Sequence, residues 1–302
     1  MYISNPYPVE GLWLKGNLHA HTEASPCGHY SLLTVAGTYS DRIMKYDFLG
    51  ITDHLTITDV SPVQGMNGLI LFSGTEFKKE GHQILGLNIA SCGDDPLDET
   101  NHQEIFDHVA YQGGISVICH PHIYCDDYWT LDRLLELKGF TGIEIYNHNV
   151  KMNNAGRAVA TDIWDSLLSR GRRVWGIASD DLHHCSRYGG GFIMVNTAEK
   201  SPASIIAAIK TGAFYASSGI LLTDFQVQDN EISAAPALTR VSGTVLRFIG
   251  TGGTVLWETK PLTPGERAVY TVQGDEGYVR IEASREDGAM AWSSPFWITP
   301  EL

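Results

Sequence analysis

The sequence predicts an α/β protein: a barrel of about seven strand–helix units over residues 1–220, followed by a small all-β, sandwich-like domain over residues 221–302. From about residue 12 to 220, short β-like runs alternate with helical patterns, which is typical of a largely parallel sheet. After Gly219 the helical patterns stop and short alternating strands follow. Histidines and carboxylates stand at the ends of several apolar runs of the first part, where the functional end of such a barrel would lie.

The elements of the first part follow from their periodicity. Leu33, Ala36, Ile43 and Met44 recur at helical spacing, so we expect a helix over 31–45. The other expected helices span 101–111, 131–137, 155–169 and 202–211. The expected strands are short apolar runs at 14–19, 48–52, 69–73, 83–89, 115–119, 142–146, 174–178 and 192–196.

The second part consists of short strands separated by turn residues such as Gly252-Gly253, Pro264-Gly265 and Asp287-Gly288. We expect the strands at 221–228, 241–248, 254–258, 268–272, 277–282 and 291–298. This segment contains no histidine, so we expect it to donate no metal ligand. The roles that remain for this segment are packing, an oligomer contact or one wall of a substrate cleft.

The composition limits the classes of partner. With 43% hydrophobic and 19% charged residues among 302, the chain is an ordinary globular protein. A formal net charge of −14 argues against nucleic acid or an anionic membrane as partner. We also expect no signal peptide and no membrane span, because no run of about 18 apolar residues occurs. Five cysteines without a Cys-x-x-Cys pair are typical of reduced thiols, and these features together predict a cytoplasmic protein.

Five short clusters contain histidine, in three of them together with aspartate or glutamate, and almost every one stands at the end of an apolar run. They are Gly16-Asn17-Leu18-His19-Ala20-His21-Thr22, Gly50-Ile51-Thr52-Asp53-His54, Gly74-Thr75-Glu76 with His82 just beyond, Ile118-Cys119-His120-Pro121-His122, and Ala178-Ser179-Asp180-Asp181-Leu182-His183. Histidine and carboxylate delivered by successive strand ends are what a multi-metal hydrolytic site requires. The sequence therefore predicts a metalloenzyme.

Two of the clusters contain chelating pairs. His19 and His21 are two residues apart on a strand, so both imidazoles face one side and can bind one cation. Asp181 and His183 repeat this spacing with a carboxylate and an imidazole. Asp180 competes with Asp181, which is favoured only by that spacing.

The middle clusters supply further candidate ligands. His54 and His120 each end a strand, and Glu76 is the candidate for a carboxylate that bridges two cations. Asp53, beside a ligand histidine, is more often a residue that orients the ligand than a ligand itself.

Other polar residues near the clusters are weaker candidates. His82 and His29 could each bind a cation or remain outside the site. His122 could line the cleft without binding metal. Lys78, Lys79 and Arg187 could hold an anionic substrate, or be ordinary solvated charges.

Other catalytic machinery has little support. The sequence contains no Gly-x-Ser-x-Gly, His-Glu-x-x-His or Gly-x-x-x-x-Gly-Lys-Ser/Thr motif. Cys119 adjoins His120, but its apolar strand lacks the basic surroundings that produce a thiolate.

In these clusters the sequence resembles the PHP (polymerase and histidinol phosphatase) metallohydrolase superfamily. His-x-His-Thr, Ile-Thr-Asp-His, Gly-x-Glu, His-Pro and Ser-Asp-x-x-His occur in the family's order over residues 14–184. The segments Tyr215-Ala216-Ser217-Ser218-Gly219, Tyr278-Val279-Arg280 and Ala291-Trp292-Ser293-Ser294-Pro295 resemble the CehA/McbA-type branch. The resemblance implies a distorted (β/α)7, TIM-like barrel with a di- or trinuclear metal site.

The resemblance also implies ligand sets for each cation. One cation would be held by His19, His21, Glu76 and Asp181; a second by Glu76 and His120, with His82; and a third by His54 and His183. For the third, His29 is the expected additional ligand and Cys27 the alternative, because many members carry a His or Asp where this sequence has Pro26-Cys27-Gly28-His29. Glu144 and Asn147 match a segment that lies near the site in relatives.

The predicted function is metal-dependent hydrolysis, with a phosphomonoester or phosphodiester as the expected substrate. Two or three divalent cations (Zn, Mn or Fe) would lower the pKa of water and supply a hydroxide as nucleophile. The expected catalytic residues are Asp181, His183 and Glu76, with His122, Asn147, Lys78, Lys79 and Arg187 expected around a small anionic substrate. The alternatives are an ester or carbamate hydrolase at the same site, or a non-catalytic metal-binding module.

Overall fold

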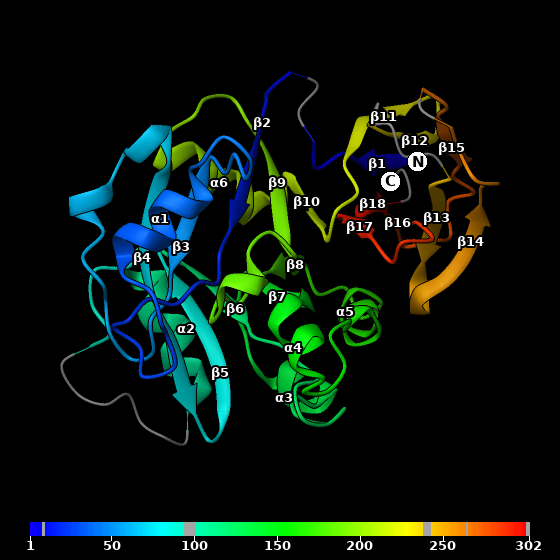
Figure 1. Cartoon of the computed structure of the whole chain (residues 1–302). Helices are drawn as coiled ribbons and strands as arrows, with labels where there is room; N and C mark the ends of the chain where they lie inside the picture. The colour runs from blue at the N-terminus through cyan, green and yellow to red at the C-terminus, as the bar shows by residue number, and fades with distance from the viewer. Residues whose placement is uncertain (8–9, 94–100, 238–242, 264, 300–302) are drawn as a thin grey trace.

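The computed structural model describes residues 1–7, 10–93, 101–237, 243–263 and 265–299, without the side chains of Lys79 and Ser186. Figure 1 shows a larger α/β part, coloured blue to green, beside a smaller part made mainly of yellow to red strands. The first residues of the strand expected at 241–248 lie outside the described ranges. No helix in those ranges is both apolar enough and long enough to cross a membrane.

The strands of the larger part form one curved sheet in the order β10-β9-β2-β3-β4-β5-β6-β7-β8. Their bounds are β2 Leu12–Asn17, β3 Phe48–Ile51, β4 Ile70–Lys79, β5 His82–Leu87, β6 Ile115–Ile118, β7 Gly142–Asn147, β8 Trp175–Ser179, β9 Phe192–Thr197 and β10 Phe214–Ser217. The pairs β2–β3, β3–β4, β6–β7 and β7–β8 are parallel, whereas β5, β9 and β10 run antiparallel to their neighbours.

Beyond β2 and β8, Ala20 and Leu182 link the last strand of this curved sheet back to β2. They form a parallel bridge, in which His21 N donates to Leu182 O at 3.1 Å and Leu182 N donates to His19 O at 3.3 Å. Strand β8 also packs against β9 and β10. The predicted distorted α/β barrel is therefore confirmed, with the antiparallel strands as its distortion.

Helices cover the outside of the barrel (Figure 1). They are α1 Leu32–Tyr39, α2 His102–Tyr111, α3 Leu131–Glu136, α4 His148–Asn153, α5 Thr161–Leu168 and α6 Pro202–Thr211, with 3₁₀ turns η1 Ser61–Val63, η2 Met66–Gly68 and η3 Cys185–Arg187. Ser31, Asn101, Thr130 and Ser201 are N-caps whose side chains accept a backbone N–H of the first turn.

Two expected helices are shorter in the structure. Helix α1 ends at Tyr39 instead of continuing to residue 45, because the Asp41 side chain accepts the backbone N–H groups of Ile43 and Met44 in a separate turn. Helix α5 begins at Thr161 instead of 155, because residues before it bond to strand ends: Arg157 N donates to His122 O.

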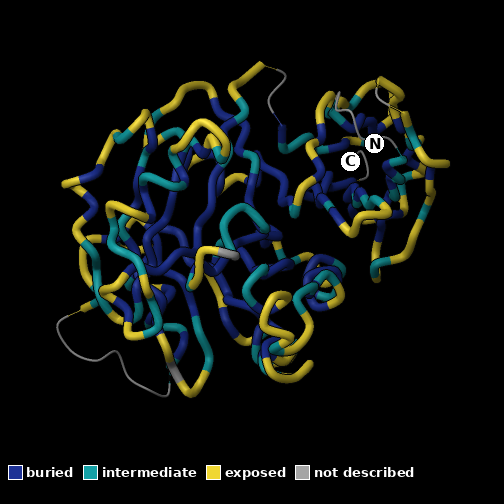
Figure 2. Tube along the Cα trace, in the orientation of Figure 1, coloured by how far each residue is buried: buried dark blue, intermediate teal, exposed yellow. Residues whose placement is uncertain are grey.

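The smaller part is a β-sandwich, as predicted. One sheet contains β11 Leu222–Gln228, β12 Glu231–Pro236 and β15 Ala268–Thr271; the other contains β13 Val245–Gly250, β14 Thr254–Glu258, β16 Tyr278–Ser284, β17 Met290–Ser293, β18 Phe296–Thr299 and β1 Tyr2–Ser4, with a 3₁₀ turn, η4 Thr251–Gly253. Ile232 and Ala268 from the first sheet pack with Phe248 and Ile281 from the second. Figure 2 shows buried chain in the interior of both parts.

The two parts share a sheet. Strand β10 of the barrel pairs with β17, and β1 pairs with β18 at the other end of the chain. The N-terminal residues therefore pack in the sandwich, although the sequence-based division at residue 220 assigned them to the barrel. Strand β12 was not expected from the sequence, and the single strand expected at 291–298 is two strands that flank Pro295.

Candidate metal centre

Two short bridges between strand extensions bring the histidine clusters together. Beyond β2 and β8, Ala20 pairs with Leu182. This bridge places the neighbours of Ala20, His19 and His21, beside the neighbours of Leu182, Asp181 and His183. Since alternate residues of an extended segment share a face, the pairs His19/His21 and Asp181/His183 point to the same side. Beyond β3, a second parallel bridge joins His54 to Glu76 of β4.

Glu76 lies at the centre of the cluster and is 1% exposed. Its Oε2 lies 3.4 Å from His19 Nε2, 3.3 Å from His21 Nε2 and 3.2 Å from His54 Nδ1. Its Oε1 lies 3.3 Å from His120 Nε2. One carboxylate thus faces four imidazoles from three different segments, the arrangement expected of a bridging ligand.

Asp181 faces two of these imidazoles, those of His19 and His21, together with that of His183. Its Oδ1 lies 3.3 Å from His19 Nε2, 3.5 Å from His21 Nε2 and 3.2 Å from His183 Nδ1. Its Oδ2 accepts hydrogen bonds of 3.2 Å from the side-chain amides of Asn147 and Asn149. These two amides fix the carboxylate so that Oδ1 points into the cluster.

Asp180 points elsewhere. Its oxygens accept the backbone N–H groups of Gly189 and Gly191 at 2.8 Å and the Tyr39 hydroxyl at 2.7 Å. Burial raises the pKa of this carboxyl to about 6, although the hydrogen bonds oppose the shift. The structure therefore brings Asp181 to the cluster and uses Asp180 to fasten the loop between β8 and β9.

Glu144 of β7, for which the resemblance implied a place near the site but no role, orients His19. His19 Nδ1 donates to Glu144 Oε1 at 2.8 Å, so His19 Nε2 is the nitrogen that faces Glu76 and Asp181. Glu144 Oε2 accepts the His120 backbone N–H at 2.8 Å and the Asn147 amide at 2.9 Å. A carboxylate between two isoleucines in a buried strand is the sequence signal that could have identified it, because such a group needs partners.

Asp53 orients the loop beyond β2, as the sequence suggested. It accepts the Thr22 N–H, the Thr22 hydroxyl and the Ser25 hydroxyl, each at 2.7 Å. Burial raises the pKa of this carboxyl, but these hydrogen bonds outweigh it and the pKa is lowered. Ser25 Oγ in turn lies 3.2 Å from His21 Nδ1 and accepts the His54 N–H at 2.9 Å.

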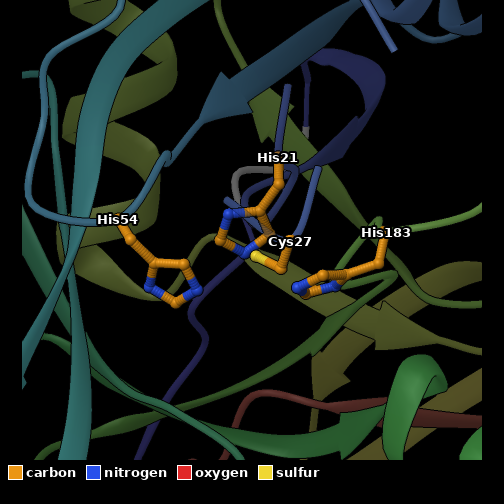
Figure 3. Close-up of side chains that lie close together, drawn as sticks. All are labelled: His21, Cys27, His54 and His183. Atoms are coloured by element: carbon orange, nitrogen blue, oxygen red, sulfur yellow. The ribbon is translucent and has the colours of Figure 1, made fainter. Parts of the chain in front are cut away.

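A second group of ligand atoms adjoins the first. The ligand atoms of His21, Cys27, His54 and His183 all lie within 4.8 Å of one another, and Figure 3 shows these side chains around the Cys27 sulfur. Burial raises the pKa of the Cys27 thiol, but hydrogen bonds with His183 and His54 outweigh it and lower the pKa to about 6. His29 is exposed and outside this group, so the structure brings Cys27 rather than His29 to the histidines expected at the third cation. The turn at Gly28 directs Cys27 inward and leaves His29 outside.

His82 does not reach the cluster either. Strands β4 and β5 are antiparallel, and Glu76 lies opposite Leu85 while His82 lies opposite Lys79, three residue pairs away. The His82 ring instead donates to the Tyr128 carbonyl and packs against Trp129. The structure therefore does not bring His82 to the other residues expected at the second cation.

The expected substrate residues are more dispersed. His122 is buried against the Asp126 carbonyl and the Asp162 carboxylate, and Lys78 is exposed on β4. Arg187 donates through Nε to Asn149 Oδ1 at 2.9 Å. The Asn149 amide in turn donates to Asp181 Oδ2, so Asn149 connects Arg187 to this carboxylate. Asn147 fixes Asp181 and Glu144, as described above. The Lys79 side chain lies outside the described residues.

The cluster carries the signature of a cation site. Burial lowers the pKa of His19, but the charges of Asp181, Glu76 and Glu144 outweigh it and raise this pKa well above its ordinary value. Burial raises the pKa of Glu76, but the neighbouring histidines outweigh it and hold this pKa well below its ordinary value. Asp181 Oδ1 and His120 Nδ1 are buried without a hydrogen-bond partner in the described structure. Buried polar atoms are rarely left without partners, so these residues fit divalent cations.

Comparison with solved structures shows the fold. A two-domain protein from Bacteroides vulgatus, described as containing a predicted PHP-like metal-dependent phosphoesterase, matches over 98% of both chains with a TM-score of 0.58 and 14% identity. PsfC from Pseudomonas syringae (13% identity, 65% of this chain and 87% of that one, TM-score 0.44) and the lesion-specific endonuclease PfuEndoQ from Pyrococcus furiosus (13%, 66% and 56%, TM-score 0.43) match less well.

No family model matches the sequence, and no curated protein matches it. At 14% identity the likeness to the B. vulgatus protein concerns the fold, and none of these similarities bears on the CehA/McbA-type branch. The chain has the same two-domain fold as the B. vulgatus protein.

Proposed function

We propose that the protein is a metal-dependent phosphoesterase that hydrolyses a small, anionic phosphate ester. The observation that carries the proposal is the buried Glu76–Asp181 cluster, in which imidazoles from several strand ends face two carboxylates and Asp181 Oδ1 has no hydrogen-bond partner among the described residues. The similarity of the fold to a protein described as a PHP-like metal-dependent phosphoesterase supports it.

We assign the ligands to sets by their geometry. His19, His21, Glu76 and Asp181 would hold one cation, and Glu76 with His120 a second. Such cations, when bound, act as Lewis acids and lower the pKa of water towards neutrality. Imidazole and carboxylate ligands suit Zn, Mn or Fe.

The chain's own residues orient this site and leave one side open. Glu144 fixes the His19 ring, and Asn147 with Asn149 fixes Asp181. The side chains of His54 and His183 are 25% and 22% exposed, whereas those of His19 and His21 are fully buried. A substrate therefore approaches past His54 and His183.

Arg187 favours a phosphate ester over a carboxylic ester or carbamate. It is held by Asn149, which also bonds Asp181, so a guanidinium stands beside the cluster. A phosphoryl group carries several anionic oxygens that such a group can bind, whereas a carbonyl centre develops a single oxyanion. The net charge of −14 favours a small substrate over a polynucleotide.

All five cysteines are free thiols, which agrees with the proposed cytoplasmic location.

The test of the function is a substrate panel on metal-loaded protein: an aryl phosphomonoester, an aryl phosphodiester, an aryl carboxylic ester, a carbamate and a DNA oligonucleotide. We expect the phosphate esters to be hydrolysed fastest, and His19→Ala to abolish this while His29→Ala does not. Turnover of the carboxylic ester or carbamate alone would replace the proposal, and inactivity on the whole panel would favour a metal-binding module.

A further inference from the structure

We propose that Cys27 binds a divalent cation through its sulfur, at a position formed with His54 and His183 that selects Zn²⁺ over Mn²⁺. The inference rests on the proposed function in that this position belongs to the same metal centre. It concerns the ligand and the choice of metal.

The loop beyond β2 is built to bring this sulfur inward. Ser25 N donates to Thr22 O and Gly28 N to Ser25 O, both at 3.0 Å, so two successive turns fold the loop back on itself. A Cβ atom on Gly28 would lie 1.8 Å from Thr22 O, so only glycine fits there. Asp53 anchors the start of the loop through Thr22 and Ser25. Cys27 consequently lies half-buried against the histidines.

The two imidazoles beside Cys27 each have one nitrogen already engaged. His54 Nδ1 lies 3.2 Å from Glu76 Oε2, and His183 Nδ1 donates to the Asp181 backbone oxygen at 2.9 Å. A histidine that donates its other ring N–H to an oxygen is oriented as metal-binding histidines are. Nε2 of each ring is therefore the nitrogen available to a cation, and in Figure 3 the two rings lie on either side of the Cys27 sulfur.

His21 lies between the two groups of ligands. Its ligand atom is within 4.8 Å of those of Cys27, His54 and His183, but its Nε2 also lies 3.3 Å from Glu76 Oε2. Cys27, His54 and His183 are thus the ligands particular to this position. Three protein ligands with one further coordination place are typical of a tetrahedral zinc site that also binds water or substrate.

The sulfur makes this position chemically different from the Glu76 set. Thiolate is a soft ligand that favours Zn²⁺, whereas carboxylate oxygens also suit Mn²⁺. Cys119 is the other cysteine near the centre, grouped with Glu76 and His120. Cys119 is buried, whereas Cys27 is half-buried with its sulfur beside three imidazoles, so Cys27 is the cysteine placed to bind this cation.

Cobalt substitution tests the sulfur ligand directly. Metal-free protein would be reloaded with Co²⁺, and the thiolate-to-cobalt charge-transfer band in the near ultraviolet recorded for wild type, Cys27→Ser, Cys27→Asp and Cys125→Ser. Cys125 is exposed and serves as the matched control. We expect the band in wild type and Cys125→Ser and its loss in both Cys27 variants. Cys27→Asp should shift the Zn²⁺/Mn²⁺ preference, measured by competition and metal analysis, by roughly tenfold or more towards Mn²⁺.

Two results would overturn the inference: no band in wild type, or a band that persists in Cys27→Ser. An unchanged Zn²⁺/Mn²⁺ preference in Cys27→Asp would contradict the proposed selectivity for Zn²⁺. Thermal melting of the metal-free variants checks that each is folded. Failure of the phosphoesterase proposal is distinguishable, because a band without phosphate-ester hydrolysis would contradict the function alone, and hydrolysis without a band would contradict the sulfur ligand alone.

Discussion

Two buried clusters of charged residues in the described part of the chain differ in how fully their polar atoms are hydrogen-bonded. Where the barrel meets the sandwich, Arg280 of β16 donates through Nε and Nη2 to both oxygens of Asp165 of α5, at 2.8 and 2.7 Å. The Tyr278 hydroxyl donates to the same carboxylate at 2.9 Å, and Glu282 accepts Nη1 of Arg280 at 3.2 Å. In the metal centre, by contrast, Asp181 Oδ1 and His120 Nδ1 have no hydrogen-bond partner among the described residues.

The contrast separates a structural cluster from one prepared for a ligand. A buried ion pair persists when its geometry and hydrogen bonds offset the loss of hydration, and Asp165 with Arg280 meets that condition without any further group. The Glu76–Asp181 cluster gathers acceptors and imidazoles at 3.2–3.5 Å, and its orphaned atoms mark places for cations. The first cluster should therefore govern stability and the second metal content.

The largest expected effect is at the centre of the ligand cluster. Glu76→Gln removes a charge that faces four imidazoles, so we expect metal affinity to fall by more than about 100-fold, since loss of a residue that merely supports a ligand already costs roughly 10- to 100-fold. Metal analysis after dialysis checks this, with His29→Ala as control. Full metal content in Glu76→Gln would show that Glu76 is not a ligand.

The next effect concerns the paired cluster. Arg280→Met leaves Asp165 buried without its partner, which we expect to lower the free energy of unfolding by about 3–5 kcal/mol. Denaturant unfolding measures it, and the double variant Arg280→Met with Asp165→Leu should recover part of the loss because no charge is left unpaired. The metal content should stay that of wild type; its loss together with stability would mean that the two clusters are coupled.

A smaller effect is expected at Glu144, which orients ligands without being placed as one. Glu144→Gln keeps the shape but weakens the bond to His19 Nδ1, so metal affinity should fall roughly 10- to 100-fold. Competition with a chelator of known affinity gives the value. Asn196→Ala, on β9 away from the cluster, is the control, and equal losses in both variants would contradict the orienting role.

The smallest effect is expected at His82. Because its ring is held by the Tyr128 carbonyl and Trp129 rather than by Glu76, His82→Ala should leave metal content and hydrolysis within about twofold of wild type, as for residues outside a shared network. Loss of one metal equivalent would restore the ligand role that the sequence suggested.

Strand ends were readable from the sequence because apolar runs set both the strands and the places where their polar residues emerge. That logic identified His19, His21 and Glu76, which the structure brings together. It favoured Asp181 over Asp180 only through the two-residue spacing to His183, because the turn in which Gly189 and Gly191 bind Asp180 cannot be read from the sequence.

The expected and observed placements differ where strand register or loop shape decides them. His82 is close to Glu76 in sequence, but the antiparallel register of β4 and β5 separates them. Cys27 and His29 exchange roles because of a turn closed by Asp53 and Gly28. Strand β12 was missed because its sequence ends in Ala-Ala-Pro, residues that are uncommon in strands.

The central claim is that hydrolysis depends on cations held by the Glu76–Asp181 cluster, and one measurement tests it most directly. Phosphate-ester hydrolysis and metal content would be measured on the same samples of wild type, Asp181→Asn and His29→Ala, before and after chelation and after readdition of Zn²⁺ or Mn²⁺. We predict that chelation abolishes hydrolysis, that readdition restores it in wild type and His29→Ala, and that Asp181→Asn stays depleted and inactive. Full hydrolysis by chelated, metal-free wild type would contradict the account.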